Sequence, residues 1–159
     1  MPKRTTSTSQ QPLEHSRYEV AEASPGYLFW RAFHAWQRHM RARLDTLGIT
    51  QVQYSILATT SYLVSQGAAV SQQDVASQLA MDKMMVSDVV KALEARSLIT
   101  RQRSEADARS FVLAVTRAGR ELLKRATPAV EAVDESFFGV LPASERSHLI
   151  KSMRQLGAE

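Results

Sequence analysis

The chain has 159 residues, of which 44% are hydrophobic, and this balance is typical of a folded protein with one domain. It contains no cysteine, which excludes disulfides, thiolate metal sites, iron–sulfur clusters and cysteine redox sensing. No apolar run approaches the ~20 residues of a membrane span, and the N-terminus lacks the apolar core of a signal peptide. We therefore expect a cytoplasmic protein that has no membrane partner.

The net charge of +4 is unevenly distributed along the chain. The segment from residue 96 to residue 125 holds eight basic and three acidic side chains. The basic ones are Arg96, Arg101, Arg103, Arg109, Arg117, Arg120, Lys124 and Arg125. Such a basic stretch around a predicted β-hairpin is typical of a surface that binds phosphate groups.

The predicted elements begin with a polar tail and a long helix. Residues 1–23 are rich in Ser, Thr and Gln and are expected to form a flexible tail. Ser24 followed by Pro25 is typical of a helix start, and the helix should extend over about residues 25–47. Its apolar stripe repeats at three- and four-residue steps and consists of Phe29, Phe33, Trp36, Met40, Leu44 and Leu47.

Capping motifs mark three shorter helices. Two capping boxes predict helices at about residues 51–64 and 72–79. The motifs are Thr50-x-x-Gln53 and Ser71-x-x-Asp74. Asp82 is the expected cap of a third helix, which should end at about Ala95. The last two helices lie close together in sequence, as in a helix-turn-helix.

Two runs of strand-forming residues follow, at Leu98–Arg103 and Ser110–Val115, with a charged six-residue segment between them. They predict a β-hairpin. Thr116 should cap a long helix, which Pro128 is expected to kink or interrupt. A last amphipathic helix should begin at about Pro142.

This order predicts a mainly α-helical fold with a small β-hairpin wing, which is a winged helix-turn-helix with N- and C-terminal dimerisation helices. One domain should cover residues 24–159, with a DNA-binding lobe at about 50–116 and dimerisation helices at about 25–47 and 117–158. Five aromatic side chains favour a two-fold dimer, because they need burial that a second copy would supply. They are Trp30, Phe33, Trp36, Phe137 and Phe138.

Six short motifs occur in order within about residues 26–157. They are Leu47-Gly48-Ile49-Thr50-x-x-Gln53-Tyr54-x-x-Leu57, Val75-Ala76-x-x-Leu79, Val86-Ser87-x-x-Val90-x-x-Leu93-Glu94, Leu98-Ile99-x-Arg101, Asp107-x-Arg109 and Val115-Thr116-x-x-Gly119. In order and spacing they resemble the MarR family (multiple antibiotic resistance regulators). The resemblance implies a homodimer with its recognition helix in the major groove of double-stranded DNA and its wing in the minor groove. It also implies repression, which many members release when a small aromatic or anionic compound binds. A two-fold dimer would bind an inverted-repeat operator.

The candidate DNA-binding residues lie on the short helix, the recognition helix and the wing. They are Ser71, Gln72, Gln73, Lys83, Met84, Ser87, Asp88, Lys91, Arg101, Arg103, Asp107 and Arg109. Asp107-x-Arg109 matches the family's wing tip, where the arginine would enter a narrow minor groove and Asp107 would hold it in position. The alternative is a solvated ion pair. Arg101 and Arg103 would either contact phosphate or support the wing.

In the recognition helix, Lys83 and Ser87 could contact phosphate or base edges. Met84 and Met85 could meet thymine methyl groups, although methionine more often serves in packing. These two methionines depart from the family pattern, which often has small hydroxylated residues in this turn.

Asp88 is a second departure, because phosphate repels a carboxylate. It would have to accept a hydrogen bond from cytosine or pair with a nearby cation such as Arg101 or Lys91. At the start of the short helix, Ser71 could face phosphate, and its capping role explains it equally well.

A second face of the first helix is the candidate ligand site. Its residues are Tyr27, Trp30, Arg31, His34 and Arg38. Aromatic walls with a cation suit an aromatic carboxylate, and the alternative is that these side chains pack in the dimer interface.

Other functions have weaker support from the sequence. There is no phosphate-binding glycine loop, no nucleophile elbow and no metal-ligand spacing among the four histidines, so we predict no enzyme activity, cofactor or metal site. Two alternatives stay open, a winged helix that binds protein and a regulator that responds to no ligand.

Overall fold

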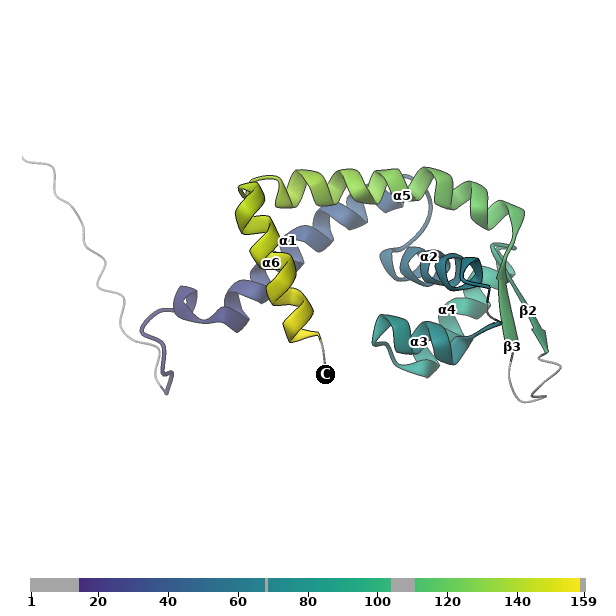
Figure 1. The fold of residues 1–159 in the computed structure, drawn as a ribbon, viewed down its shortest axis with the longest axis horizontal. Helices are drawn as coiled ribbons and strands as arrows, with labels where there is room; N and C mark the ends of the chain where they lie inside the picture. The colour runs from purple at the N-terminus through teal and green to yellow at the C-terminus, as the bar shows by residue number, and fades with distance from the viewer. Residues whose placement is uncertain (1–14, 68, 104–110, 158–159) are drawn as a thin grey trace, which may run out of the picture. The chain divides into compact units, whose positions relative to one another are not determined.

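The computed structural model describes residues 15–67, 69–103 and 111–157 (Figure 1). The chain forms two compact units, residues 1–38 and 39–159. Helix α1 (Pro25–Asp45) begins in the first unit and ends in the second. Before it, the short 3-10 helix η1 (Ala21–Ala23) lies entirely in the first unit.

The cap predicted at the start of α1 is confirmed. Ser24 Oγ accepts a hydrogen bond of 3.3 Å from the backbone N–H of Tyr27. Proline is well suited to the first helical position, where its missing N–H has no intrahelical partner. The predicted apolar stripe differs along its length, because Met40 and Leu44 are buried whereas Phe29 is 62% exposed.

Caps also define the next three helices, α2 (Gln51–Ser65), α3 (Gln72–Leu79) and α4 (Lys83–Ala95). Both predicted capping boxes form, with a hydroxyl and a side chain three residues later each bonded to the other's backbone N–H. Ala80 adopts a left-handed φ of 50° and turns the chain from α3 into α4. The predicted helix-turn-helix is confirmed.

Three strands form an antiparallel sheet in the order β1-β3-β2. The strands are β1 (Val70–Ser71), β2 (Ile99–Arg103) and β3 (Phe111–Val115). The predicted hairpin is confirmed, with Ile99 opposite Val115. The sequence did not predict β1, which pairs Val70 with Leu113 and makes the hairpin part of a three-stranded sheet. The segment between β2 and β3 lies outside the described residues.

The hydrophobic core of the second unit joins α2, α3, α4 and the sheet. Its fully buried side chains include Ile56, Leu57, Val75, Val86, Val90, Leu93, Ile99 and Leu113. The buried hydroxyl of Thr60 donates to the backbone carbonyl of Ile56 at 2.7 Å, so its polar atom is satisfied inside the core. This packing fixes one face of α4 and leaves the opposite face toward solvent.

Arg96 joins the end of α4 to the turn before α2. Its Nη2 donates to the Gly48 carbonyl oxygen at 2.8 Å, and its Nη1 donates to Gln53 Oε1 at 3.1 Å. The same Gln53 oxygen accepts from the backbone N–H of Thr50 in the capping box. Charge-assisted hydrogen bonds therefore add to the core contacts that hold α4 against α2.

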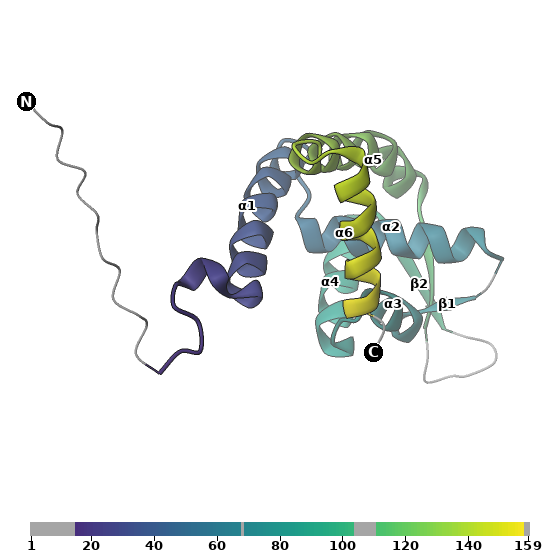
Figure 2. The same cartoon turned by 60° about the vertical axis from the view of Figure 1, so that its left-hand side comes forward.

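Helices α5 (Arg117–Phe138) and α6 (Ala143–Leu156) complete the chain, and α6 turns back at an angle to α5 (Figure 2). The predicted cap of α5 is confirmed. Thr116 Oγ1 accepts from the backbone N–H of Gly119 at 3.0 Å, and its hydroxyl donates to the Ser97 carbonyl at 2.7 Å.

Of the kink or interruption expected at Pro128, the interruption is wrong, because α5 continues through this residue (Figure 1). A proline inside a helix removes one backbone hydrogen bond, here the one that would reach the Lys124 carbonyl. The neighbouring side chains of Ala126 and Ala129 are buried, and α5 packs against α2. Tertiary packing therefore keeps the helix intact despite the lost bond.

Candidate nucleic-acid interface

Helix α4 presents a polar face opposite its buried face. Val86, Val90 and Leu93 are buried on one side. At 100° per residue, Met84, Asp88, Lys91 and Ala95 point to the opposite side, and all four are exposed. Lys83 is also exposed and Ser87 is half-buried. Of the predicted contact residues, Met84, Asp88 and Lys91 therefore lie on the outer face and Ser87 lies beside it. Lys83 is nearer to the buried side, where it is exposed as the first residue of α4.

Asp82 occupies the beginning of α4. Its Oδ1 accepts from the backbone N–H of Met84 at 2.8 Å and from that of Met85 at 3.1 Å. A helix N-terminus attracts phosphate through such free N–H groups. At α4 the Asp82 carboxylate already binds two of these N–H groups, so the helix end disfavours a phosphate. Any contacts of this turn with DNA would then be made by its side chains.

The charges on the outer face of α4 are paired. Asp88 Oδ1 and Lys91 Nζ lie 2.9 Å apart, and both side chains are more than half exposed. Of the two cations that the sequence offered as partners for Asp88, the structure selects Lys91. The pair lowers the repulsion that an unpaired Asp88 would exert on DNA.

Arg101 on β2 is held inside the lobe rather than extended into solvent. Its Nε donates to Glu94 Oε2 at 2.7 Å, with side-chain exposures of 21% and 35%. Its guanidinium also lies 5.1 Å from the centre of the Phe111 ring on β3. These contacts connect α4, β2 and β3, and they favour the supporting role over the phosphate contact.

The remaining wing residues differ in what the structure describes. Arg103 is exposed at the end of β2. Asp107 and Arg109, the predicted wing tip, lie outside the described residues.

The beginning of α3 carries the other predicted contacts. Ser71 is engaged in its capping box, since Asp74 Oδ2 accepts from both its backbone N–H and its hydroxyl at 2.8 Å. Gln73 is exposed and its Nε2 lies 3.4 Å from Ser77 Oγ, while Gln72 is half-buried. Local hydrogen bonds thus account for Ser71, and Gln73 faces solvent.

The predicted ligand face on α1 is a set of mutual contacts. Trp30 and His34 form an edge contact with ring centres 4.0 Å apart. Arg31 lies 5.7 Å above the Tyr27 ring and 3.7 Å from Glu22. Arg38 is exposed. Within the described part of the chain, His34 Nε2 is buried without a hydrogen-bond partner.

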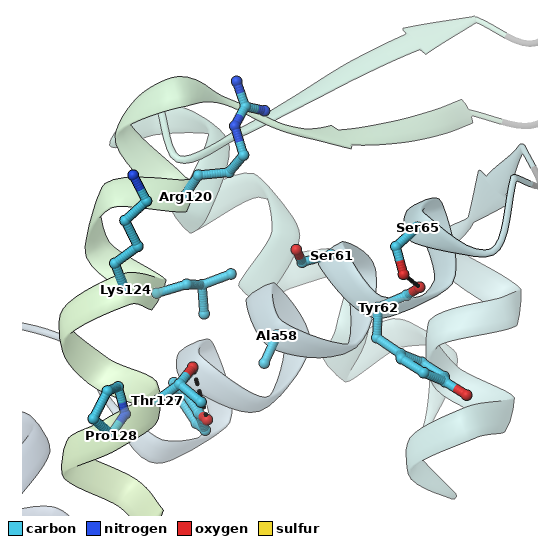
Figure 3. A pocket seen from close by; sticks show the side chains of 10 residues that line it. Ala58, Ser61, Tyr62, Ser65, Arg120, Lys124, Thr127 and Pro128 are labelled. Carbon is cyan, nitrogen blue, oxygen red and sulfur yellow. Dashed lines mark hydrogen bonds between the residues drawn. The ribbon is translucent and has the colours of Figure 1, made fainter.

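A cavity of about 640 Å³ lies between α2 and α5, at residues that the sequence did not predict as a ligand site (Figure 3). Its lining consists of Tyr54, Ala58, Ser61, Tyr62, Ser65, Arg120, Leu123, Lys124, Thr127 and Pro128. These residues recur at helical spacing on two distant segments. Only the packing of α2 against α5 brings them together, which is why the sequence alone did not reveal the cavity.

The polar groups of this cavity are ordered by neighbours. Tyr54 donates its hydroxyl to Thr127 Oγ1 at 3.4 Å, and Arg120 Nη1 donates to the Val115 carbonyl oxygen at 2.6 Å. Lys124 Nζ bonds Glu121 Oε1 at 2.8 Å, and this hydrogen bond and charge lower the pKa of Glu121. The cavity therefore combines two phenol rings with two cations.

The described residues contain neither a cluster of metal ligands nor a membrane-spanning helix. No group of three or more His, Asp or Glu side chains there is arranged to hold a metal ion. No helix in the same residues is long and apolar enough to cross a membrane.

Comparison with known proteins supports the winged helix-turn-helix fold of the chain. The sequence model of the MarR family matches residues 49–111. YdcH, an HTH-type transcriptional regulator of Bacillus subtilis, is 33% identical over 142 residues, which cover 89% of this chain and 95% of that protein. NicR, an HTH-type transcriptional repressor of Pseudomonas putida, is 26% identical over 98% of this chain and 95% of its own length.

A solved structure of BpsR from Bordetella bronchiseptica, whose DNA binding is regulated by 6-hydroxynicotinic acid, superposes with a TM-score of 0.81. It is 26% identical and covers 91% of this chain and 99% of its own. The winged helix-turn-helix, the order of the helices and the similarity along nearly the whole chain agree, and the chain belongs to the MarR family of transcriptional regulators.

Proposed function

We propose that the chain is a homodimeric repressor that binds an inverted-repeat operator and leaves it when a small aromatic, anionic ligand binds. The observation that carries the DNA-binding part is the arrangement of α4. The helix is capped at its start and packs one face on the core, and its outer face exposes Met84, Asp88 and Lys91. Exposed aromatic side chains on α1, such as Phe29 and Trp30, support pairing with a second copy. Since the proposed target is DNA, we also propose that the chain acts in the cytoplasm.

The relatives named above are regulators and not enzymes, and we propose that this chain has no catalytic activity. We propose that Lys83, Ser87, Arg103 and the wing-tip Arg109 contact DNA directly. Arg101 instead supports the wing. Asp107 keeps its proposed role of holding Arg109.

Selection of duplexes from random sequence by the purified protein should enrich an inverted repeat with half-sites about 10 base pairs apart. Lys83→Ala and Arg109→Ala should each weaken binding to the enriched duplex, because each removes a cation from the DNA-facing surface. Binding should also weaken steeply as salt is raised. Lys151→Ala, at an exposed lysine on α6, is the matched control and should bind like the wild type.

Failure to enrich any sequence at low salt would contradict this proposal. It would favour the protein-binding winged helix, for which Asp82 and Asp88 on α4 are the supporting residues.

For the ligand we propose the cavity between α2 and α5 in preference to the α1 face. The phenol rings of Tyr54 and Tyr62 suit an aromatic ring, and Arg120 and Lys124 suit a carboxylate. On the α1 face, Trp30 packs against His34 and Arg31 lies over the Tyr27 ring, which supports the packing alternative for that set.

Addition of 6-hydroxynicotinic acid, the compound named for BpsR, tests this site in a DNA-release titration. Lys124→Gln should raise the ligand concentration that releases half of the DNA by about tenfold, as expected for the loss of one charge-assisted bond. Its DNA affinity without ligand should stay unchanged, and Lys151→Gln should behave like the wild type. If neither this acid nor benzoate-type analogues release DNA from the wild type, the regulator that responds to no such ligand is favoured.

A further inference from the structure

Two large apolar side chains stand next to each other in solvent at the beginning of the recognition helix. Met84 is 69% exposed and Met85 is 52% exposed. Methionine usually fills gaps in the core, so two adjacent methionines that are both exposed are unusual unless they contact a partner. The structure thus removes the packing explanation within the chain for both residues.

Their position makes them part of the DNA-facing surface. Both belong to the first turn of α4, and Met84 points to the side opposite the buried Val86. Met85 follows 100° around the helix, so the two side chains cover one edge and the centre of the exposed face. In a winged helix-turn-helix this part of the helix enters the major groove.

The surrounding charges make this turn a poor binding site for phosphate. Asp82 already accepts hydrogen bonds from the backbone N–H groups of both methionines. Asp88, one helical turn after Met84, is paired with Lys91 at 2.9 Å, so the positive charge of Lys91 is already compensated. Lys83, the first residue of α4, is the cation of this turn that can reach phosphate, and the contacts of the two methionines are left to base edges.

Among the base edges of the major groove, the C5 methyl group of thymine is the apolar feature. We propose that Met84 and Met85 are specificity residues that contact thymine methyl groups in each half-site. This inference rests on the proposed binding of α4 in the major groove and adds the base feature that α4 recognises. Burial of one methyl group corresponds to about a fourfold gain in affinity.

Uracil tests this directly, because it differs from thymine only by lacking the methyl group. The first probe pair is a 40-base-pair alternating dA-dT duplex and its dA-dU counterpart, titrated at low salt. The wild type should bind the dA-dT duplex at least fourfold more tightly. The double variant Met84→Ala/Met85→Ala should bind both duplexes equally. The Val52→Ala variant, which shortens an exposed apolar side chain on α2, should keep the preference.

The second probe is the duplex enriched by selection, with each thymine replaced singly by uracil. One or two positions in each half-site should lose about fourfold in affinity, and the loss should disappear in the double variant. Met84→Leu should retain the sensitivity because it keeps an apolar side chain. Thermal unfolding of each variant checks that its fold is intact.

The outcomes separate this inference from the proposed function. A protein that binds neither alternating duplex and enriches no sequence contradicts DNA binding itself. A protein that binds DNA with equal affinity for thymine and uracil at every position contradicts only the methionine contact. A uracil effect that persists unchanged in the double variant also overturns it, since the effect then arises from DNA shape.

Discussion

Replacing Gly119 with alanine should lower the free energy of unfolding by about 1–3 kcal/mol. A Cβ atom at this position would lie 2.3 Å from the Leu98 carbonyl oxygen and 2.8 Å from Val115 Cγ1. The Leu98 oxygen cannot move freely, because it accepts a hydrogen bond of 3.1 Å from the backbone N–H of Thr116. The clash therefore disturbs the junction of β3, α5 and the turn before β2.

Chemical denaturation measures this loss, and a second glycine provides its control. Gly26 lies in the first turn of α1, where an added Cβ would meet nothing closer than Ser24 Oγ at 4.0 Å. Gly26→Ala should keep or raise stability, because alanine is favoured over glycine in a helix by about 1 kcal/mol. Equal stability of Gly119→Ala and the wild type would show that the junction relaxes without cost.

The second large effect concerns the ion pair between Arg101 and Glu94. A double-mutant cycle with Arg101→Met and Glu94→Gln should give a coupling of about 1–2 kcal/mol, because the 2.7 Å pair is partly buried and charge-assisted. Arg101→Met should also weaken binding to the selected duplex, because it loosens β2 and β3 from α4. Urea denaturation and DNA titration measure the two effects on the same variants.

The exposed pair of Asp88 and Lys91 is the matched control on the same helix. Its nitrogen–oxygen distance of 2.9 Å is similar, but its side chains are 57% exposed for lysine and 70% for aspartate. Its coupling should not exceed about 0.5 kcal/mol. Equal couplings for the two pairs would mean that burial of Arg101 contributes nothing.

The sequence predicted the helix starts well because a cap is a local arrangement. The hydroxyls of Thr50, Ser71 and Thr116 each bond a backbone N–H three residues later, so the pattern is visible in four consecutive residues. Asp82 follows the same rule.

The features that the sequence missed depend on distant segments. Strand β1 has only two residues, and it forms because Val70 pairs with Leu113, which lies 43 positions later in the chain. The cavity between α2 and α5 has the same origin, as does the burial of Arg101 by Phe111 and Glu94. The error at Pro128 arose because a local rule was applied where packing against α2 outweighs it.

The guanidinium of Arg96 has a mechanical consequence. It bonds the Gly48 carbonyl and the Gln53 side chain, so the C-terminal end of α4 and the first turn of α2 are clamped at two points. Rotation of α4 has to carry the beginning of α2 with it or break both bonds together. The two bonds therefore tie the orientation of α4 to the start of α2 and favour movement of the two helices as one body.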